Sequence, residues 1–284
     1  MNSKSLAPAA VSGARPAPIA NISDKLCRNL EYIFTDIDDT ITEKGKIPAS
    51  TLEAVWKLHE NGIRVVPVTG RPAGWCDYIA RMWPAAGVIG ENGAFYFSYD
   101  EGSRRVIRKY AQTEEVRKEG RRKLDKIRDR VLREVPGCGI ASDQDFRIAD
   151  LAVDFCEDVI PLSEGEVDRI CSIAHEEGAT YKISSIHVNC WYGDYDKLTC
   201  FNLFLEDFTG KNLDMMQDRI LFMGDSLNDE PMFEKLDHTI AVANISKFLK
   251  RLKHFPSYIT ENESAAGFYE AAGIILKKRG LSRS

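Results

Sequence analysis

The chain has 284 residues, of which 44% are hydrophobic and 29% are charged, and its net charge is −5. This length allows one large domain or two medium ones. The acidic balance argues against nucleic acid as a partner, because nucleic-acid-binding proteins usually carry a basic excess. No apolar run approaches the roughly 20 residues that a membrane-spanning helix needs, so we expect no membrane partner either.

The cysteines and the N-terminal segment bear on location. The seven cysteines are scattered and no pair has CxxC spacing, so neither a zinc site nor a redox pair is predicted. Free thiols are typical of a reducing cytosol, and we expect a cytoplasmic location. The N-terminal segment is rich in Ala, Pro and Ser and lacks the apolar core of a secretory signal. We expect residues 1–30 to form a flexible leader.

After this leader, short apolar runs alternate with amphipathic segments. The runs 32–35, 64–68 and 87–90 predict buried strands, and the segments 49–61 and 72–83 between them predict helices. Strands that alternate with helices in this way favour a parallel sheet with helices on both faces. The predicted fold class is therefore α/β, with a Rossmann-like parallel core.

The alternation breaks over residues 94–192, where strands and helices are grouped. Two apolar runs flank an Asp-Glu-Gly turn and predict a hairpin, and helices are expected at 113–134 and 163–177. We predict that 94–192 is an inserted α+β cap domain, and that 31–93 and 193–284 form the core.

The first candidate site residues, Asp36 and Asp38, directly follow a buried strand. Two converging carboxylates cannot both stay ionised cheaply unless a cation lies between them, and magnesium prefers oxygen ligands. One carboxylate could attack phosphorus, and the other could donate a proton and later activate water. A calcium loop is the first alternative, but Ile41 and Ile47 stand where its glycine and glutamate belong. An acidic turn that caps a helix is the second.

Two further segments could bind phosphate. Thr69 ends the next strand, and its hydroxyl and the N–H groups of the following helix could form a phosphate cradle. Gly70 lets the backbone approach closely, and Arg71 could clamp the phosphate. Lys197 begins a later helix, where a cation is unfavourable unless an anion binds nearby. The alternatives are an ordinary N-cap for Thr69, a solvated Arg71 and an exposed surface Lys197.

The last cluster follows the predicted strand 220–223. Asp225 can reach a metal from the sheet edge. Asp229 can hold a metal-bound water or orient Lys197, and Asn228 is a further candidate for phosphate binding. The alternative is a loop in which Asn228 or Asp229 caps a helix.

The order of these motifs resembles the haloacid dehalogenase-like (HAD) superfamily of phosphatases. The matching motifs are Asp-x-Asp-x-Thr at 36–40, a Thr at 69, a Lys at 197 and Gly-Asp-x-x-x-Asp at 224–229. The long insertion resembles the cap of subfamily IIB, which includes phosphatases for trehalose, sucrose and mannosylglycerate phosphates. The turn Glu91-Asn92-Gly93-Ala94 is similar to the turn that leads into that cap.

The resemblance implies a role for each motif residue. Asp36 would be the nucleophile and a Mg²⁺ ligand. Asp38 would be the general acid/base and would offer its backbone carbonyl to the metal. Asp225 would be the remaining protein ligand. We also assign Asp229 to the metal site, because it could hold a metal-bound water. Thr69 and Lys197 would bind phosphate.

Substrate contacts are expected in the cap. His187, Asn189 and Trp191 alternate with apolar residues, so they share one face of a strand. If this face looks toward Asp36, His187 and Asn189 could hydrogen-bond sugar hydroxyls while Trp191 stacks on the ring. The alternative is a half-buried sheet with its polar side in water.

The sequence therefore predicts a magnesium-dependent phosphatase that hydrolyses a small phosphomonoester, with a sugar phosphate as the expected substrate, through an aspartyl-phosphate. A phosphomutase on the same core and a non-catalytic phosphosugar-binding module remain alternatives, and a monomer and a dimer are both possible. A dinucleotide-binding domain is disfavoured, because Gly87, Gly90 and Gly93 do not form GxGxxG after the first strand.

Overall fold

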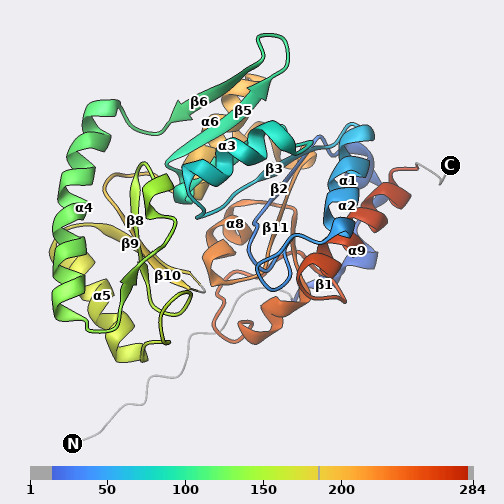
Figure 1. The fold of residues 1–284 in the computed structure, drawn as a ribbon. Helices are drawn as coiled ribbons and strands as arrows, with labels where there is room; N and C mark the ends of the chain where they lie inside the picture. The colour runs from blue at the N-terminus through green and yellow to red at the C-terminus, as the bar shows by residue number, and fades with distance from the viewer. Residues whose placement is uncertain (1–14, 185, 281–284) are drawn as a thin grey trace, which may run out of the picture.

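The computed structural model describes residues 15–184 and 186–280, and its largest sheet has six strands (Figure 1). The strand order is β1-β13-β12-β11-β2-β3, and every neighbouring pair is parallel. In chain order the strands are β1 (Ala17–Pro18), β2 (Tyr32–Thr35), β3 (Arg64–Pro67), β11 (Ile220–Gly224), β12 (Thr239–Ala241) and β13 (Tyr258–Ile259). The predicted α/β fold with a parallel core is confirmed.

Helices cover both faces of this sheet because successive side chains of a strand point to opposite faces. In β2, Ile33 packs on one face with three helices, and Phe34 packs on the other, with its ring 3.7 Å from that of Phe201 in α6 (Lys197–Thr209). The three helices of the first face are α1 (Asp24–Asn29), α2 (Ala49–Glu60) and α9 (Ser264–Lys278). The core also contains α3 (Ala73–Met82), α7 (Leu213–Met216) and α8 (Glu230–Lys235).

A three-stranded antiparallel sheet extends from the core. Its strands are β4 (Val88–Gly90), β5 (Phe95–Asp100) and β6 (Arg105–Tyr110), and a parallel bridge between Val68 and Ile89 links it to the end of β3. The predicted hairpin is present as β5 and β6. Phe95 and Phe97 belong to the same buried cluster as α3, so the hairpin packs with the core helices. The expected start of the cap at residue 94 stays a prediction.

The rest of the insertion forms a four-stranded antiparallel sheet backed by two helices (Figure 1). The sheet order is β7-β8-β10-β9. Its elements are α4 (Glu114–Glu134), β7 (Gly139–Ile140), β8 (Asp150–Asp154), α5 (Glu164–Glu176), β9 (Thr180–Ile183) and β10 (His187–Trp191). Val188 and Cys190 pack under the helices, which leaves the other face of β10 toward the core. In the described residues, no helix has the length and apolar character needed to span a membrane.

The structure differs from the expected flexible leader in its second half. Residues 1–14 lie outside the described residues, but β1 pairs with β13, and α1 begins with Ser23 accepting the N–H of Leu26. Ile19 and Ile22 are buried in the same cluster as α9. These two apolar side chains give residues 17–30 a core to fold against, which the Pro- and Ala-rich composition of the segment obscures.

Candidate active site

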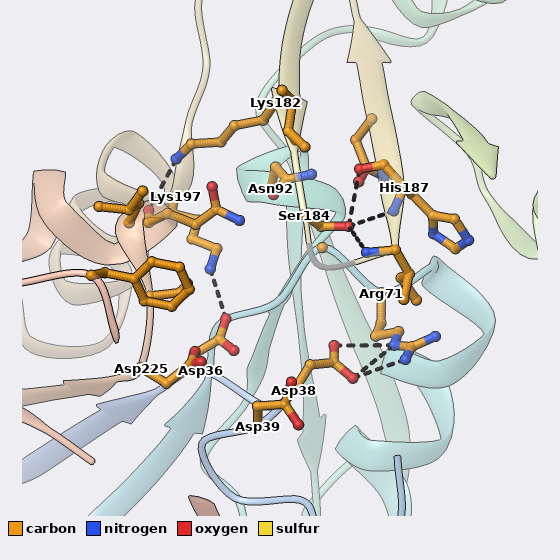
Figure 2. Close-up of a pocket in the computed structure, with 18 of the residues that line it drawn as sticks. Asp36, Asp38, Asp39, Arg71, Asn92, Lys182, Ser184, His187, Lys197 and Asp225 are labelled. Atoms are coloured by element: carbon orange, nitrogen blue, oxygen red, sulfur yellow. Dashed lines mark hydrogen bonds and ion pairs between the residues drawn. The ribbon is translucent and has the colours of Figure 1, made fainter. Parts of the chain in front are cut away.

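The parallel pairing of β2 and β11 brings the two acidic loops together. Thr35 pairs with Met223, and the N–H of Asp36 donates to the Met223 carbonyl at 2.9 Å. Asp36 and Asp225 therefore leave neighbouring strands at the same sheet edge, and both line one pocket with Asp38 (Figure 2). The hydroxyl of Thr40 donates to Asp225 Oδ1 at 3.3 Å, which ties the first loop to the last.

Lys197 points at Asp36 from the start of α6. Its Nζ lies 2.7 Å from Asp36 Oδ1 (Figure 2). The same Nζ lies 3.4 Å from Asp229 Oδ1. Burial opposes the charge of Lys197, but Asp36 and Asp229 outweigh it and raise the pKa of the ammonium, so the residue stays protonated. Lys197 is thus a buried cation beside the predicted nucleophile rather than an exposed surface lysine, and its binding of phosphate stays a prediction.

The start of α6 is held in place by a glycine. Gly93 has φ +104°, and an added Cβ would lie 2.0 Å from the Asp196 carbonyl oxygen. The turn before the hairpin therefore packs directly on the residue that caps α6. This contact fixes the position of Lys197, the first residue of the helix.

The buried carboxylates of Asp36 and Asp225 repel other nearby carboxylates, and a bound hard cation would offset this repulsion. Burial, followed by repulsion from Asp229 and other carboxylates, raises the pKa of both groups, although Lys197 opposes the shift at Asp36. Asn244 Nδ2 donates to Asp225 Oδ2 at 3.1 Å and orients it. No group of three or more His, Cys, Asp and Glu placed for a metal occurs among the described residues. Magnesium uses few protein ligands and only oxygen donors, so the two carboxylates suit it.

Asp38 and Arg71 bind each other rather than facing the nucleophile. Arg71 Nη2 lies 2.8 Å from Asp38 Oδ1, and Nε lies 3.1 Å from Oδ2 (Figure 2). The same guanidinium lies 3.6 Å from Glu157 of the cap and 4.7 Å from the centre of the Trp75 ring. Arg71 lines the pocket, but Asp38 occupies its guanidinium, so its role as a phosphate clamp stays a prediction.

Thr69 lies beneath the pocket rather than on its surface. The side chain is buried, and its hydroxyl accepts the N–H of Arg71 at 3.0 Å. Gly70 does line the pocket, and an added Cβ would lie only 3.3 Å from the side-chain amide of Asn92. Gly70 is thus packed closely against Asn92, and phosphate binding by Gly70 and Thr69 stays a prediction.

Asp229 is fully buried and supports the last loop. Its Oδ2 accepts the N–H groups of Asp225 at 3.0 Å and Ser226 at 3.2 Å, and its Oδ1 accepts from Lys197. Gly224 leaves room for this carboxylate, because an added Cβ would lie 2.4 Å from Asp229 Oδ2. These contacts fit the predicted role of orienting Lys197. Metal binding by Asp229 stays a prediction, and Asn228 lines the pocket.

The cap contributes two of its three predicted residues to the pocket. His187 and Asn189 line it, and Asn189 Nδ2 donates to Asp150 Oδ2 at 3.0 Å. Burial lowers the pKa of His187 to about 4, so the ring is neutral at pH 7. Trp191 differs from the expectation that it stacks on a sugar. It is buried and donates its indole N–H to the Tyr195 carbonyl, because β10 runs from the pocket into the core cluster at its end.

Comparison with known proteins decides the family. The sequence profile of the haloacid dehalogenase-like hydrolases matches residues 33–119 and 204–271. The chain belongs to this family. The phosphoglycolate phosphatase of Methanobrevibacter smithii is 25% identical over 252 residues, which cover 86% of this chain and 97% of that protein. This similarity and the family match support the prediction of a phosphatase enzyme.

Solved structures of other proteins share the fold of this chain. Protein 0175 of Thermoplasma acidophilum superposes with a TM-score of 0.66 at 19% identity, covering 89% of this chain and 99% of that one. The sucrose-phosphatase of Synechocystis sp. PCC6803 gives a TM-score of 0.60 at 15% identity, covering 87% and 98%. At these identities the likeness concerns the fold alone.

Sequence reasoning missed two side chains that join the cap to the hydrolase core. The buried Glu91 carboxylate accepts N–H groups of Ala73 in the core at 3.0 Å and of Ala149 in the cap at 2.7 Å. Arg147, also buried, donates to the Gly70 carbonyl at 3.0 Å. Only the Glu91 turn offered a signal, through its resemblance to the turn before the cap. Arg147 looked like any basic residue of a charged segment.

The pocket between core and cap has a volume of about 760 Å³. Its floor is formed by Asp36, Asp38 and Asp225, and its cap side by His187 and Lys182 (Figure 2). Asn189 of β10 also lines it. Lys182 is a third contributor that the sequence analysis did not single out. A volume of this size suits a small molecule.

Proposed function

We propose that this hydrolase is a magnesium-dependent phosphatase that cleaves a small phosphomonoester through an aspartyl-phosphate on Asp36. The observation that carries the proposal is the position of Lys197, whose ammonium lies 2.7 Å from the Asp36 carboxylate at the floor of the pocket. An uncharged nucleophile would not need this partner, and a purely structural ion pair would not need to line a pocket.

The residues of the chain divide the reaction between them. Asp36 attacks phosphorus, and the bond from phosphorus to the ester oxygen breaks. Asp38, once free of Arg71, gives a proton to the leaving oxygen and then takes one from the water that hydrolyses the aspartyl-phosphate. Lys197 offsets negative charge on Asp36 and the phosphate throughout. Magnesium, when held by Asp36, Asp225 and the backbone carbonyl of Asp38, would neutralise further charge on the phosphate oxygens.

Two substrate classes are supported by separate observations. His187 and Asn189 line the pocket and could hydrogen-bond the hydroxyls of a sugar phosphate, as the sequence predicted. The curated relatives at 24–25% identity are named as phosphoglycolate phosphatases, which favours a smaller substrate. Both are phosphomonoesters of the size that the pocket admits. A cytoplasmic location remains a prediction from the cysteine content.

The test is release of inorganic phosphate from sugar phosphates, glycerol phosphate and phosphoglycolate, with magnesium and then with EDTA. We expect release only with the metal present, and none from an Asp36→Asn variant that keeps the wild-type circular dichroism and melting temperature, since an amide is a poor nucleophile. Wild-type release by folded Asp36→Asn would refute the mechanism. Conversion of the substrate to an isomer without phosphate release would identify a phosphomutase.

A further inference from the structure

Lys182 lies in β9, and its side chain lines the pocket. Its Nζ donates to the backbone carbonyl of Asn228 at 3.1 Å, which spans from the cap to the core (Figure 2). Among residues 15–184 and 186–280, no carboxylate oxygen lies within 4 Å of this ammonium. Lys197, by contrast, has two carboxylate partners.

The surroundings of Lys182 favour an anion. Burial lowers the pKa of its ammonium, and the nearby charge of Lys197 acts in the same direction. The carboxylates of Asp229, Asp196 and Asp36, which lie beyond ion-pair distance, oppose this shift without reversing it. Removing the ammonium from water costs free energy that a single hydrogen bond to a carbonyl does not recover. A negatively charged group beside the ammonium would offset this desolvation cost. Two of its three N–H donors are left for such a group.

The position of Lys182 assigns this anion to the leaving group of the substrate. Phosphate binding is predicted for residues of the core, and Lys197 points at Asp36 from there. Lys182 comes from the cap side of the pocket (Figure 2). The contacts of Arg147 with Gly70 and of Glu91 with Ala149 join the cap to the core and so fix this placement. A single half-buried cation matches the one negative charge of a carboxylate better than the two of a second phosphate.

The rim of the pocket adds positive charge. Lys247 and Arg251 line it and are exposed, and neither has a carboxylate within 4 Å among the described residues. A chain of net charge −5 thus has two exposed cations, together with the exposed Glu263, among the residues that line its pocket. Such a rim raises the local concentration of a substrate that carries several negative charges.

We infer that Lys182 is a specificity-determining residue that binds a carboxylate on the leaving group, so that the preferred substrate is a small phosphorylated hydroxy acid. This inference rests on the proposed phosphatase function. It favours a substrate of the phosphoglycolate type over a neutral sugar phosphate, because no neutral sugar hydroxyl would offset the charge of Lys182.

The test compares phosphoglycolate with 2-hydroxyethyl phosphate, which carries a hydroxymethyl group in place of the carboxylate. We expect the wild-type kcat/KM to be at least about tenfold higher for phosphoglycolate, since a hydrogen bond to a charged group contributes an effect of this size. Lys182→Met should lower the ratio of the two kcat/KM values by at least about tenfold. Lys126→Met, a matched change of an exposed cap lysine in α4, should leave the ratio at its wild-type value.

Each result decides the matter. A wild-type enzyme that hydrolyses both esters equally well would overturn the inference, even if Lys182→Met does not fold. An equal loss on both esters in Lys182→Met would also overturn it, because Lys182 would then serve the phosphate or the fold. Release of phosphate from sugar phosphates but from neither ester would overturn the inference as well. In all three cases the proposed function would stand, since it fails only if no phosphomonoester of the full screen releases phosphate or if folded Asp36→Asn remains active.

Discussion

Replacement of Lys197 by methionine tests the electrostatics of the site most directly. The ammonium is buried between the carboxylates of Asp36 and Asp229, at 2.7 and 3.4 Å, and the side chain is only 8% exposed. Removing one member of a buried ion pair leaves the other charges uncompensated and costs about 3–5 kcal/mol. We therefore expect Lys197→Met to lower the free energy of unfolding by about 3–5 kcal/mol near neutral pH.

The pH dependence of this loss has a definite sign. The folded-state pKa of Lys197 is raised above its ordinary value of 10.5, so the lysine contributes stability that is fully present below pH 10.5 and is lost above it. Burial already raises the pKa of Asp36 above 3.8, and without Lys197 it rises further. The Lys197→Met variant thus loses stability, relative to the wild type, as the pH rises above 3.8. Its stability approaches that of the wild type at lower pH, where the buried carboxylates are protonated.

Urea unfolding in EDTA, at about pH 5 and about pH 8, measures both effects, because the chelator removes any stabilisation by bound metal. The exposed cap lysine variant Lys126→Met serves as the control. A loss for Lys197→Met below about 1 kcal/mol would mean that the ion pairs are solvated, contrary to the structure. A larger loss at the lower pH would contradict the assigned sign.

Two further variants test how the site is held together. Gly93→Ala should destabilise the protein by at least about 2 kcal/mol, because its Cβ would meet the Asp196 carbonyl. Gly62→Ala, which has a positive φ but open space around it, should destabilise it by only about 1 kcal/mol. Equal melting temperatures for the two variants would contradict this expectation. Asn244→Ala should raise the magnesium concentration needed for half-maximal phosphate release by about 10–100-fold, because Asp225 loses its orienting donor. An unchanged magnesium titration would show that Asn244 does not position a metal ligand.

Local patterns predicted much of the fold. A central parallel strand is buried on both faces, so an uninterrupted apolar run such as 32–35 predicts one. The alternation of such runs with helical segments then predicted the parallel sheet of the core. The early part of the chain was harder. Ile19 and Ile22 stand among Ala and Pro without a periodic pattern, and they fold only because α9, more than 240 residues later, offers them a surface.

The candidate site divides in the same way. The motif residues Asp36 and Asp225 could be named from their neighbours, because each directly follows a strand and the ends of parallel strands meet at one sheet edge. Trp191 could not be placed from its alternation alone. Period-two alternation assigns a side chain to a face, but it does not say where along the strand that face leaves the pocket and enters the core.

By itself, the sequence determined the strand-ending motifs and hence the chemistry that this hydrolase can offer, since those features depend on residues adjacent in the chain. Only the tertiary structure decided that Arg71 binds Asp38, that Arg147 and Glu91 join the cap to the core, and that Lys182 hangs over the pocket without a carboxylate partner among the described residues. These contacts link segments that are far apart in the chain. No local propensity encodes them, because their energy arises only when packing removes the water between the groups.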